Sequence, residues 1–91
     1  MRVEYLASYD RAFRKLPPLV QSHAIEAIDS LLDYFQTGRR PHGLGLKRLR
    51  KVYWEIRVGL DVRILFQLQR DYLSFVFVGD HDEMRRWLRE L

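Results

Sequence analysis

Two side chains in the second half of the sequence have the chemistry to act together on an anionic substrate. Arg63 lies between Val62 and Ile64 in an alternating run, so its planar guanidinium points away from their apolar side and can bind two oxygens. His81 follows an apolar run, and imidazole is the side chain that exchanges protons near neutral pH. The alternatives are structural: Arg63 is then an ordinary exposed arginine, and His81 or Asp80 caps the next helix. We favour the chemical interpretation of Arg63 and His81.

Charged neighbours could complete such a site. Asp82 could orient His81 or supply a second acid–base group, and its negative charge would raise the affinity of the imidazole for protons. Glu55 and Arg57 share one face of the strand predicted before Arg63, where they form either an ion pair or part of the same site. We favour a structural role for Arg57 and leave the role of Glu55 open.

The positive charge of the sequence is concentrated in one stretch. Residues 38–63 hold eight Lys and Arg against two Asp and Glu, a net +6, whereas residues 1–37 and 64–91 each carry −1. Such a patch favours a polyanionic partner over the alternative of a solvated basic face. Alternation places Lys47 and Leu49 on one face of their strand and the arginines at 48 and 50 on the other, so we expect Lys47 to approach the site. The other candidate polyanion-binding residues are Arg39, Arg40, Arg48, Arg50, Lys51 and Arg57.

Composition excludes several classes of protein. A chain of 91 residues with 47% hydrophobic residues predicts one domain, residues 1–91, that folds by packing alone. Without cysteine there is no disulfide framework, zinc finger or iron–sulfur cluster, and an intracellular, cytoplasmic location is expected. No apolar run is long enough to cross a membrane, and no P-loop, dinucleotide or metalloprotease motif is present. We therefore expect neither a membrane partner nor a metal, nucleotide or other small-molecule cofactor.

The hydrophobic pattern changes period once along the chain. Helical spacing predicts a short helix capped by Ser8 and ended by the prolines at 17 and 18, a second helix from Leu19 to about Thr37 with Gly38 as its C-cap, and a short C-terminal helix. Period-two alternation predicts strand segments at 3–5, 52–58 and 62–68, and a short basic strand is predicted at 46–50. The run at 72–79 is apolar on both faces, which predicts a central strand covered on both sides. The expected fold is α+β in the order β-α-α-β-β-β-α, with the helical hairpin packed on one face of a mostly antiparallel four-stranded sheet.

This order of elements, with three sequence motifs, resembles the RelE/ParE superfamily of bacterial and archaeal toxins. The motifs are GLGLKRLRKVYWEIRVG, DVRILF and FVFVGDHDE, and the resemblance covers nearly the whole chain. It implies that Arg63 matches the arginine acting on the scissile phosphate, that His81 matches the C-terminal histidine of YoeB- and YafQ-like members, and that Lys47 lies on the active face. Glu55 lies in the region of a proposed general base of YoeB. Asp82 stands where a tyrosine is expected, which leaves the general acid open.

The resemblance also implies a function and partners. The expected function is that of the toxin of a type II toxin–antitoxin pair, a metal-independent endoribonuclease that cleaves mRNA on the ribosome and so inhibits translation. RNA is then the polyanion that the basic residues bind, and the expected partners are mRNA, the ribosome and a cognate acidic antitoxin. The alternatives are a ParE-like DNA gyrase inhibitor that cleaves nothing and a non-toxic RNA-binding module.

Overall fold

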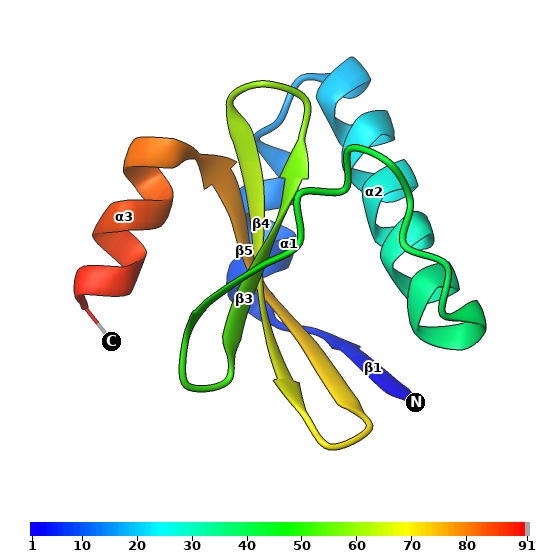
Figure 1. The fold of residues 1–91 in the computed structure, drawn as a ribbon. Coiled ribbons are helices and arrows are strands. Elements are labelled where there is room, and N and C mark those ends of the chain that lie inside the picture. The colour runs from blue at the N-terminus through cyan, green and yellow to red at the C-terminus, as the bar shows by residue number, and fades with distance from the viewer. Residues whose placement is uncertain (91) are drawn as a thin grey trace.

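The structure, a computed structural model, describes residues 1–90 of the chain. It is an α+β fold, the class that the sequence predicts, and in this region it has five strands and three helices, one strand more than the predicted order β-α-α-β-β-β-α (Figure 1). In chain order they are β1 (Arg2–Tyr5), α1 (Ala7–Arg14), α2 (Pro18–Thr37), β2 (Lys47–Arg50), β3 (Tyr53–Val58), β4 (Val62–Gln69), β5 (Tyr72–Asp80) and α3 (His81–Arg89).

All five strand segments join one sheet, so the expectation of four strands is wrong. Their order is β1-β5-β4-β3-β2, antiparallel throughout except that β1 runs parallel to β5. The sequence predicts strand segments at both β1 and β2, but a local pattern does not show which segments join one sheet. Backbone pairing with one neighbouring strand places each of these two edge strands in the sheet.

Helices cover both faces of the sheet. The α1–α2 hairpin packs on one face over a core that includes Leu31, Ile56, Ile64 and Phe66, as predicted. The other face is not left open, because α3 lies across it and buries Leu65 with two further apolar residues, Val76 and Met84. Figure 1 shows α2 and α3 on opposite sides of the sheet. None of the helices in residues 1–90 is long and apolar enough to cross a membrane.

A β-bulge in β5 explains why Ser8 does not cap α1. The register between β4 and β5 shifts between Leu65 and Phe66, which leaves Val76 as the extra residue of β5. The Ser8 hydroxyl donates to the carbonyl of Val76 at 2.5 Å, and the N-cap of α1, Leu6, makes no side-chain cap bond. The predicted N-cap role of Ser8 is therefore wrong. The Ser8 hydroxyl donates instead to the carbonyl of Val76, the extra residue of the bulge.

The buried tyrosine of α1, Tyr9, is expected to make the protein less stable at alkaline pH. Burial, and then the neighbouring Tyr5 and Asp10, raise the pKa of Tyr9 well above its ordinary value of 10.0. The folded protein therefore holds this proton more tightly than the unfolded chain, and the stabilisation is complete below pH 10 and lost as the pH rises above it. We expect Tyr9→Phe to unfold at a higher pH than the wild type in an alkaline titration followed by circular dichroism.

A matched control is available on α2. Tyr34 is half-buried and belongs to no cluster around Tyr9, so Tyr34→Phe should leave the alkaline midpoint of the wild type unchanged. Equal midpoints for Tyr9→Phe and the wild type would show that the Tyr9 proton does not limit alkaline stability.

Candidate functional site

Four charged side chains lie together on the sheet face that α3 partly covers. Lys47 on β2 pairs with Glu55 on β3, and Arg57 on β3 pairs with Arg63 on β4. Paired residues of antiparallel strands project on the same side, and Arg63 shares that side with the α3-covered Leu65 two residues later. The structure thus gathers Lys47, Glu55, Arg57 and Arg63 in one row across three strands.

The guanidinium of Arg63 is held in place from two directions. Its Nε lies 3.7 Å from Oε2 of Glu55, and its Nη1 donates to the carbonyls of Leu60 and Val62, both at 3.2 Å. The side chains of Arg63 and Glu55 are 16% and 15% exposed. No further hydrogen bond of Arg63 lies within residues 1–90, so its Nη2 makes no hydrogen bond to this part of the protein.

Glu55 is the centre of the row. Lys47 is its partner across β2 and β3, and Arg63 reaches it diagonally from β4. The contact of the Glu55 carboxylate with the Nε of Arg63 limits the directions in which the arginine fork can point, whereas Lys47 makes no ion pair with Glu55 within residues 1–90. The geometry thus gives Glu55 a defined contact with Arg63, which the sequence alone left open, and it leaves Arg57 exposed beside Arg63.

His81 is the first residue of α3 and lies close to this row along the sheet. On β5, Gly79 pairs with Arg63 and Asp80 pairs with Val62. His81 is the next residue of the chain after Asp80. Its side chain is exposed and makes no hydrogen bond or ion pair within residues 1–90, with Asp82 or with any other group. The structure therefore brings His81 near Arg63 and does not show Asp82 orienting it.

Asp80, not His81, caps α3. Its carboxylate accepts from the Glu83 backbone N–H at 2.8 Å, and the Glu83 carboxylate accepts from the Asp80 backbone N–H at 2.9 Å. This reciprocal capping box leaves the imidazole of His81 without a capping role. We expect Asp80→Ala to lower the free energy of unfolding by about 1 kcal/mol in urea, because it leaves donors at the helix start without partners.

Asp80→Asn is the matched control for that variant. The amide keeps an oxygen that accepts from the Glu83 N–H, so Asp80→Asn should unfold close to the wild type. Equal losses in Asp80→Ala and Asp80→Asn would show that the charge of Asp80, and not its capping bond, stabilises the start of α3.

The remaining basic residues do not share one face, and a β-bulge changes the predicted division. The register of β2 and β3 shifts between Arg48 and Arg50, so Arg48 pairs with Trp54 whereas Arg50 pairs with Tyr53. Arg50 therefore turns to the α3 side, where it donates to the Leu88 carbonyl, and the prediction that it shares a face with Arg48 is wrong.

Arg48 and the loop arginines make local contacts. Arg48 donates to the Lys51 carbonyl at 2.9 Å, and Arg40 donates to the Leu46 carbonyl at 2.7 Å, whereas Arg39 is exposed. Among residues 1–90 the Arg63–Glu55 contact is the one ion pair between side chains. The basic stretch is thus largely unneutralised by the protein itself, which favours an anionic partner over internal pairing.

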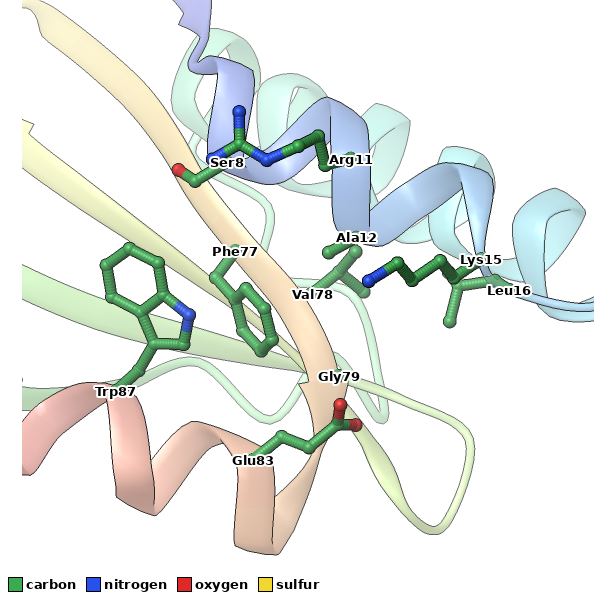
Figure 2. Close-up of a pocket in the computed structure, with 10 residues that line it drawn as sticks. All are labelled: Ser8, Arg11, Ala12, Lys15, Leu16, Phe77, Val78, Gly79, Glu83 and Trp87. Carbon is green, nitrogen blue, oxygen red and sulfur yellow. The ribbon is translucent and has the colours of Figure 1, made fainter.

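A cavity of about 310 Å³ lies between α1 and α3, next to β5, and was not anticipated from the sequence (Figure 2). Arg11 and Lys15 of α1 line it together with Glu83 and Trp87 of α3, and Gly79 forms part of its wall. Figure 2 shows the α1 side chains and the α3 side chains facing each other across β5. The spacing of four residues between Arg11 and Lys15 is the one signal that places them on a common helix face.

None of the acidic and histidine side chains of residues 1–90 gather in groups of three or more as they would around a metal ion. The geometry of the row therefore offers an anion-binding arginine, a carboxylate that orients it, a lysine and a nearby free imidazole. Such a set can bind a phosphate and move protons at its oxygens.

Comparison with known proteins identifies the fold. No family model matches the chain, and no curated protein matches it in sequence. Among solved structures, the RelB–RelE antitoxin–toxin complex of Methanococcus jannaschii matches with a TM-score of 0.71 at 15% identity, over 91% of this chain and 95% of that one. The E. coli DinJ–YafQ complex matches with a TM-score of 0.67 at 18% identity, over 92% and 98%.

A third match is the RelBE2 toxin–antitoxin complex of Mycobacterium tuberculosis, with a TM-score of 0.66 at 19% identity over 88% of this chain and 96% of that one. The architecture is thus that of the toxins of toxin–antitoxin pairs. More narrowly, the chain has the fold of RelE and YafQ, as its sequence motifs indicate.

Proposed function

We propose that the chain is the toxin of a type II toxin–antitoxin pair and that it acts as an endoribonuclease on mRNA. The observation that carries the proposal is the guanidinium of Arg63, held by Glu55 and by the Leu60 and Val62 carbonyls, at the end of the sheet where β5 passes into α3 at the exposed His81. An arginine held in this way meets a phosphate without a large loss of side-chain freedom.

The proposed reaction uses the RNA's own nucleophile. The 2′-oxygen attacks the adjacent phosphorus, the bond from phosphorus to the 5′-oxygen breaks, and the products are a 2′,3′-cyclic phosphate and a 5′-hydroxyl. A base takes the 2′-hydroxyl proton and an acid gives one to the leaving 5′-oxygen. Arg63 stabilises the negative charge of the phosphorane, Lys47 holds the backbone, and His81 transfers a proton, with Asp82 as a second acid–base group. No metal is required, because the nucleophile lies within the substrate.

The basic residues outside the row fit the role of holding RNA. Arg39, Arg48 and Lys51 are exposed and unpaired with acidic side chains within residues 1–90, and Arg57 lies beside Arg63. Contacts of this kind bind phosphates without reading sequence. We place the reaction on the ribosome, where ribosomal RNA can help to position mRNA, and hence in the cytoplasm.

An antitoxin partner follows from the same proposal. RelE of M. jannaschii and YafQ of E. coli were solved in complex with their antitoxins, RelB and DinJ. The net +6 of residues 38–63 favours an acidic antitoxin that covers this surface and blocks access to the row. A short acidic reading frame next to that of this chain would support the pairing.

The test compares the wild type with an Arg63→Ala, His81→Ala double variant. Cells expressing each are assayed for growth, and mRNA ends on stalled ribosomes are mapped. New mRNA ends with the wild type and none with the double variant are expected. A matched control replaces the same residue types elsewhere, His23 on the exposed side of α2 and Arg70 in the β4–β5 turn, and it should cleave like the wild type.

Two outcomes would overturn the nuclease proposal. Equal toxicity of the wild type and the double variant, with altered DNA supercoiling and no new mRNA ends, would indicate ParE-like inhibition of DNA gyrase. No toxicity and no new mRNA ends with the wild type would indicate a non-toxic RNA-binding module.

A further inference from the structure

The outer edge of β1 is an exposed strand edge with apolar side chains. β1 is the first strand of the sheet and pairs on one side only, with β5. Met1, Val3 and Tyr5 are 56%, 40% and 45% exposed, so this edge is not shielded by the helices. Edge strands are protected from such pairing by prolines, bulges, short length or charged side chains. β1 has no proline and no bulge, but it is four residues long and carries Arg2 and Glu4, so only a strand that matches these charges can pair with it.

The backbone of β1 shows which groups are free to pair. The N–H groups of Arg2 and Leu6 point toward β5, where they donate to the carbonyls of Asp71 and Phe75 at 2.8 and 3.0 Å. Because successive residues of a strand point in opposite directions, the N–H and C=O groups of Val3 and Tyr5 point outward. A second strand can therefore add to β1 only through the residues at positions 1, 3 and 5.

The charges of β1 select one arrangement of such a strand. In an antiparallel pair of identical strands with Val3 opposite Val3, the outward groups of Val3 bond to each other and those of Met1 bond to Tyr5. The same register sets Arg2 opposite Glu4 and Glu4 opposite Arg2. These lie in the closely spaced, non-hydrogen-bonded positions, where opposite charges attract most strongly.

Other registers lose one or both of these matches. A shift by one residue brings inward-pointing backbone groups to the interface, and a shift by two residues sets either Glu4 opposite Glu4 or Arg2 opposite Arg2, so that like charges face each other. Within each copy, Glu4 accepts from the Tyr72 hydroxyl and the Arg2 guanidinium lies over the Tyr72 ring, 5.2 Å from its centre, so both charged side chains lie on the same face of β1.

The apolar side of β1 adds to the same surface. Met1 and Val3 line a cavity of about 400 Å³ together with Leu32 and Phe35 of α2. A two-fold axis through Val3, perpendicular to the sheet, puts the helical layers of both copies on the same side. The exposed Met1, Val3 and Tyr5 side chains of both copies then meet on that side and lose contact with water.

We propose that two copies of this chain associate through β1, in an antiparallel pair centred on Val3, to form one continuous ten-stranded sheet. The surface lies at the opposite edge of the sheet from the basic strand β2, so the dimer leaves the row of Lys47, Glu55 and Arg63 accessible in each copy. The paired strands are short, and we expect a weak, concentration-dependent dimer with a dissociation constant in the micromolar range, on the order of 10–100 µM.

The test is sedimentation equilibrium of the full chain with two charge reversals. Arg2→Glu sets two acidic residues against each other across the axis, and Glu4→Arg does the same with two basic residues. Each variant alone is expected to dimerise at least about tenfold more weakly than the wild type. An equimolar mixture of the two variants should form a heterodimer, because each copy then meets the opposite charges.

The double variant Arg2→Glu, Glu4→Arg separates pairing from folding. It loses the same contacts to Tyr72 as the single variants and restores opposite charges across the axis, so it should dimerise like the wild type. Thermal unfolding of all three variants checks that they are folded. The proposal is overturned if the wild type stays monomeric over the whole concentration range, if the folded single variants dimerise like the wild type, or if their mixture forms no heterodimer.

Discussion

Arg63→Ala is expected to reduce the rate of RNA cleavage by about 100- to 1,000-fold, the loss typical when one preorganised donor to a developing negative charge is removed. The side chain that is lost is oriented before substrate binds, by Glu55 at 3.7 Å and by the Leu60 and Val62 carbonyls. Because its effect is largest when negative charge develops on the phosphate, kcat should fall far more than KM rises. Single-turnover cleavage of mRNA on purified ribosomes measures both.

Arg57→Ala is the matched control for this prediction. Arg57 lies directly opposite Arg63 on the same face but is exposed, and no bond fixes its guanidinium within residues 1–90. We expect Arg57→Ala to weaken the binding of RNA and to make the RNA affinity depend less on salt concentration, while kcat stays nearly unchanged. Equal losses of kcat in Arg57→Ala and Arg63→Ala would show that Arg63 contributes only to the charge of the surface.

Arg63→Lys distinguishes the shape of the guanidinium from its charge. Lysine keeps the positive charge but presents one ammonium in place of a planar fork with several donors, so it cannot hold Glu55 and two phosphate oxygens together. We expect a rate between those of the wild type and Arg63→Ala. A rate equal to that of the wild type would mean that charge alone suffices at this position.

Most of the fold could be predicted from the sequence because its strongest signals are local. The helical spacing of apolar residues places α2 at Pro18–Thr37 against the predicted 19–37, and Gly38 adopts the left-handed conformation, φ 79°, that ends it. The sheet count was wrong because membership of a sheet depends on distant partners. Arg2–Tyr5 joins the sheet through β5, some seventy residues away in the chain, and no local pattern contains that information.

The candidate site shows the same division between local and distant information. Alternation placed Arg63 on the face away from the helical hairpin, and the structure has it there. The contact of Glu55 with Arg63 depends on the register between β3 and β4, and the turn of Arg50 toward α3 depends on a bulge after Arg48. A bulge reverses the face of every following residue, so alternation alone assigns Arg50 to the wrong side. The capping bonds of Asp80, in contrast, follow from its spacing to Glu83.

Phe75→Ala is expected to have the largest effect on stability, a loss of about 3–5 kcal/mol in the free energy of unfolding. Phe75 is fully buried, and its ring lies against Tyr5 of β1, Tyr9 of α1 and Phe66 of β4, with ring centres 5.0, 6.0 and 5.9 Å apart. Removal of the ring leaves a cavity between three elements that the sheet order fixes in place, so neighbouring side chains cannot collapse to fill it.

A loss of that size is decisive for a chain of this length. Domains near 90 residues have about 5–14 kcal/mol of stability in total, so Phe75→Ala should move the urea midpoint far toward zero or leave the protein partly unfolded without denaturant. Leu60→Ala is the control, since Leu60 is 89% exposed in the β3–β4 turn and should change stability by less than about 0.5 kcal/mol. Phe75→Leu retains part of the side-chain volume, so its loss of stability should fall between those of Phe75→Ala and Leu60→Ala.

Similar urea midpoints for Phe75→Ala and Leu60→Ala would mean that the aromatic cluster does not hold β1 and α1 to the sheet. The edge of β1 would then lack the support that its proposed pairing requires.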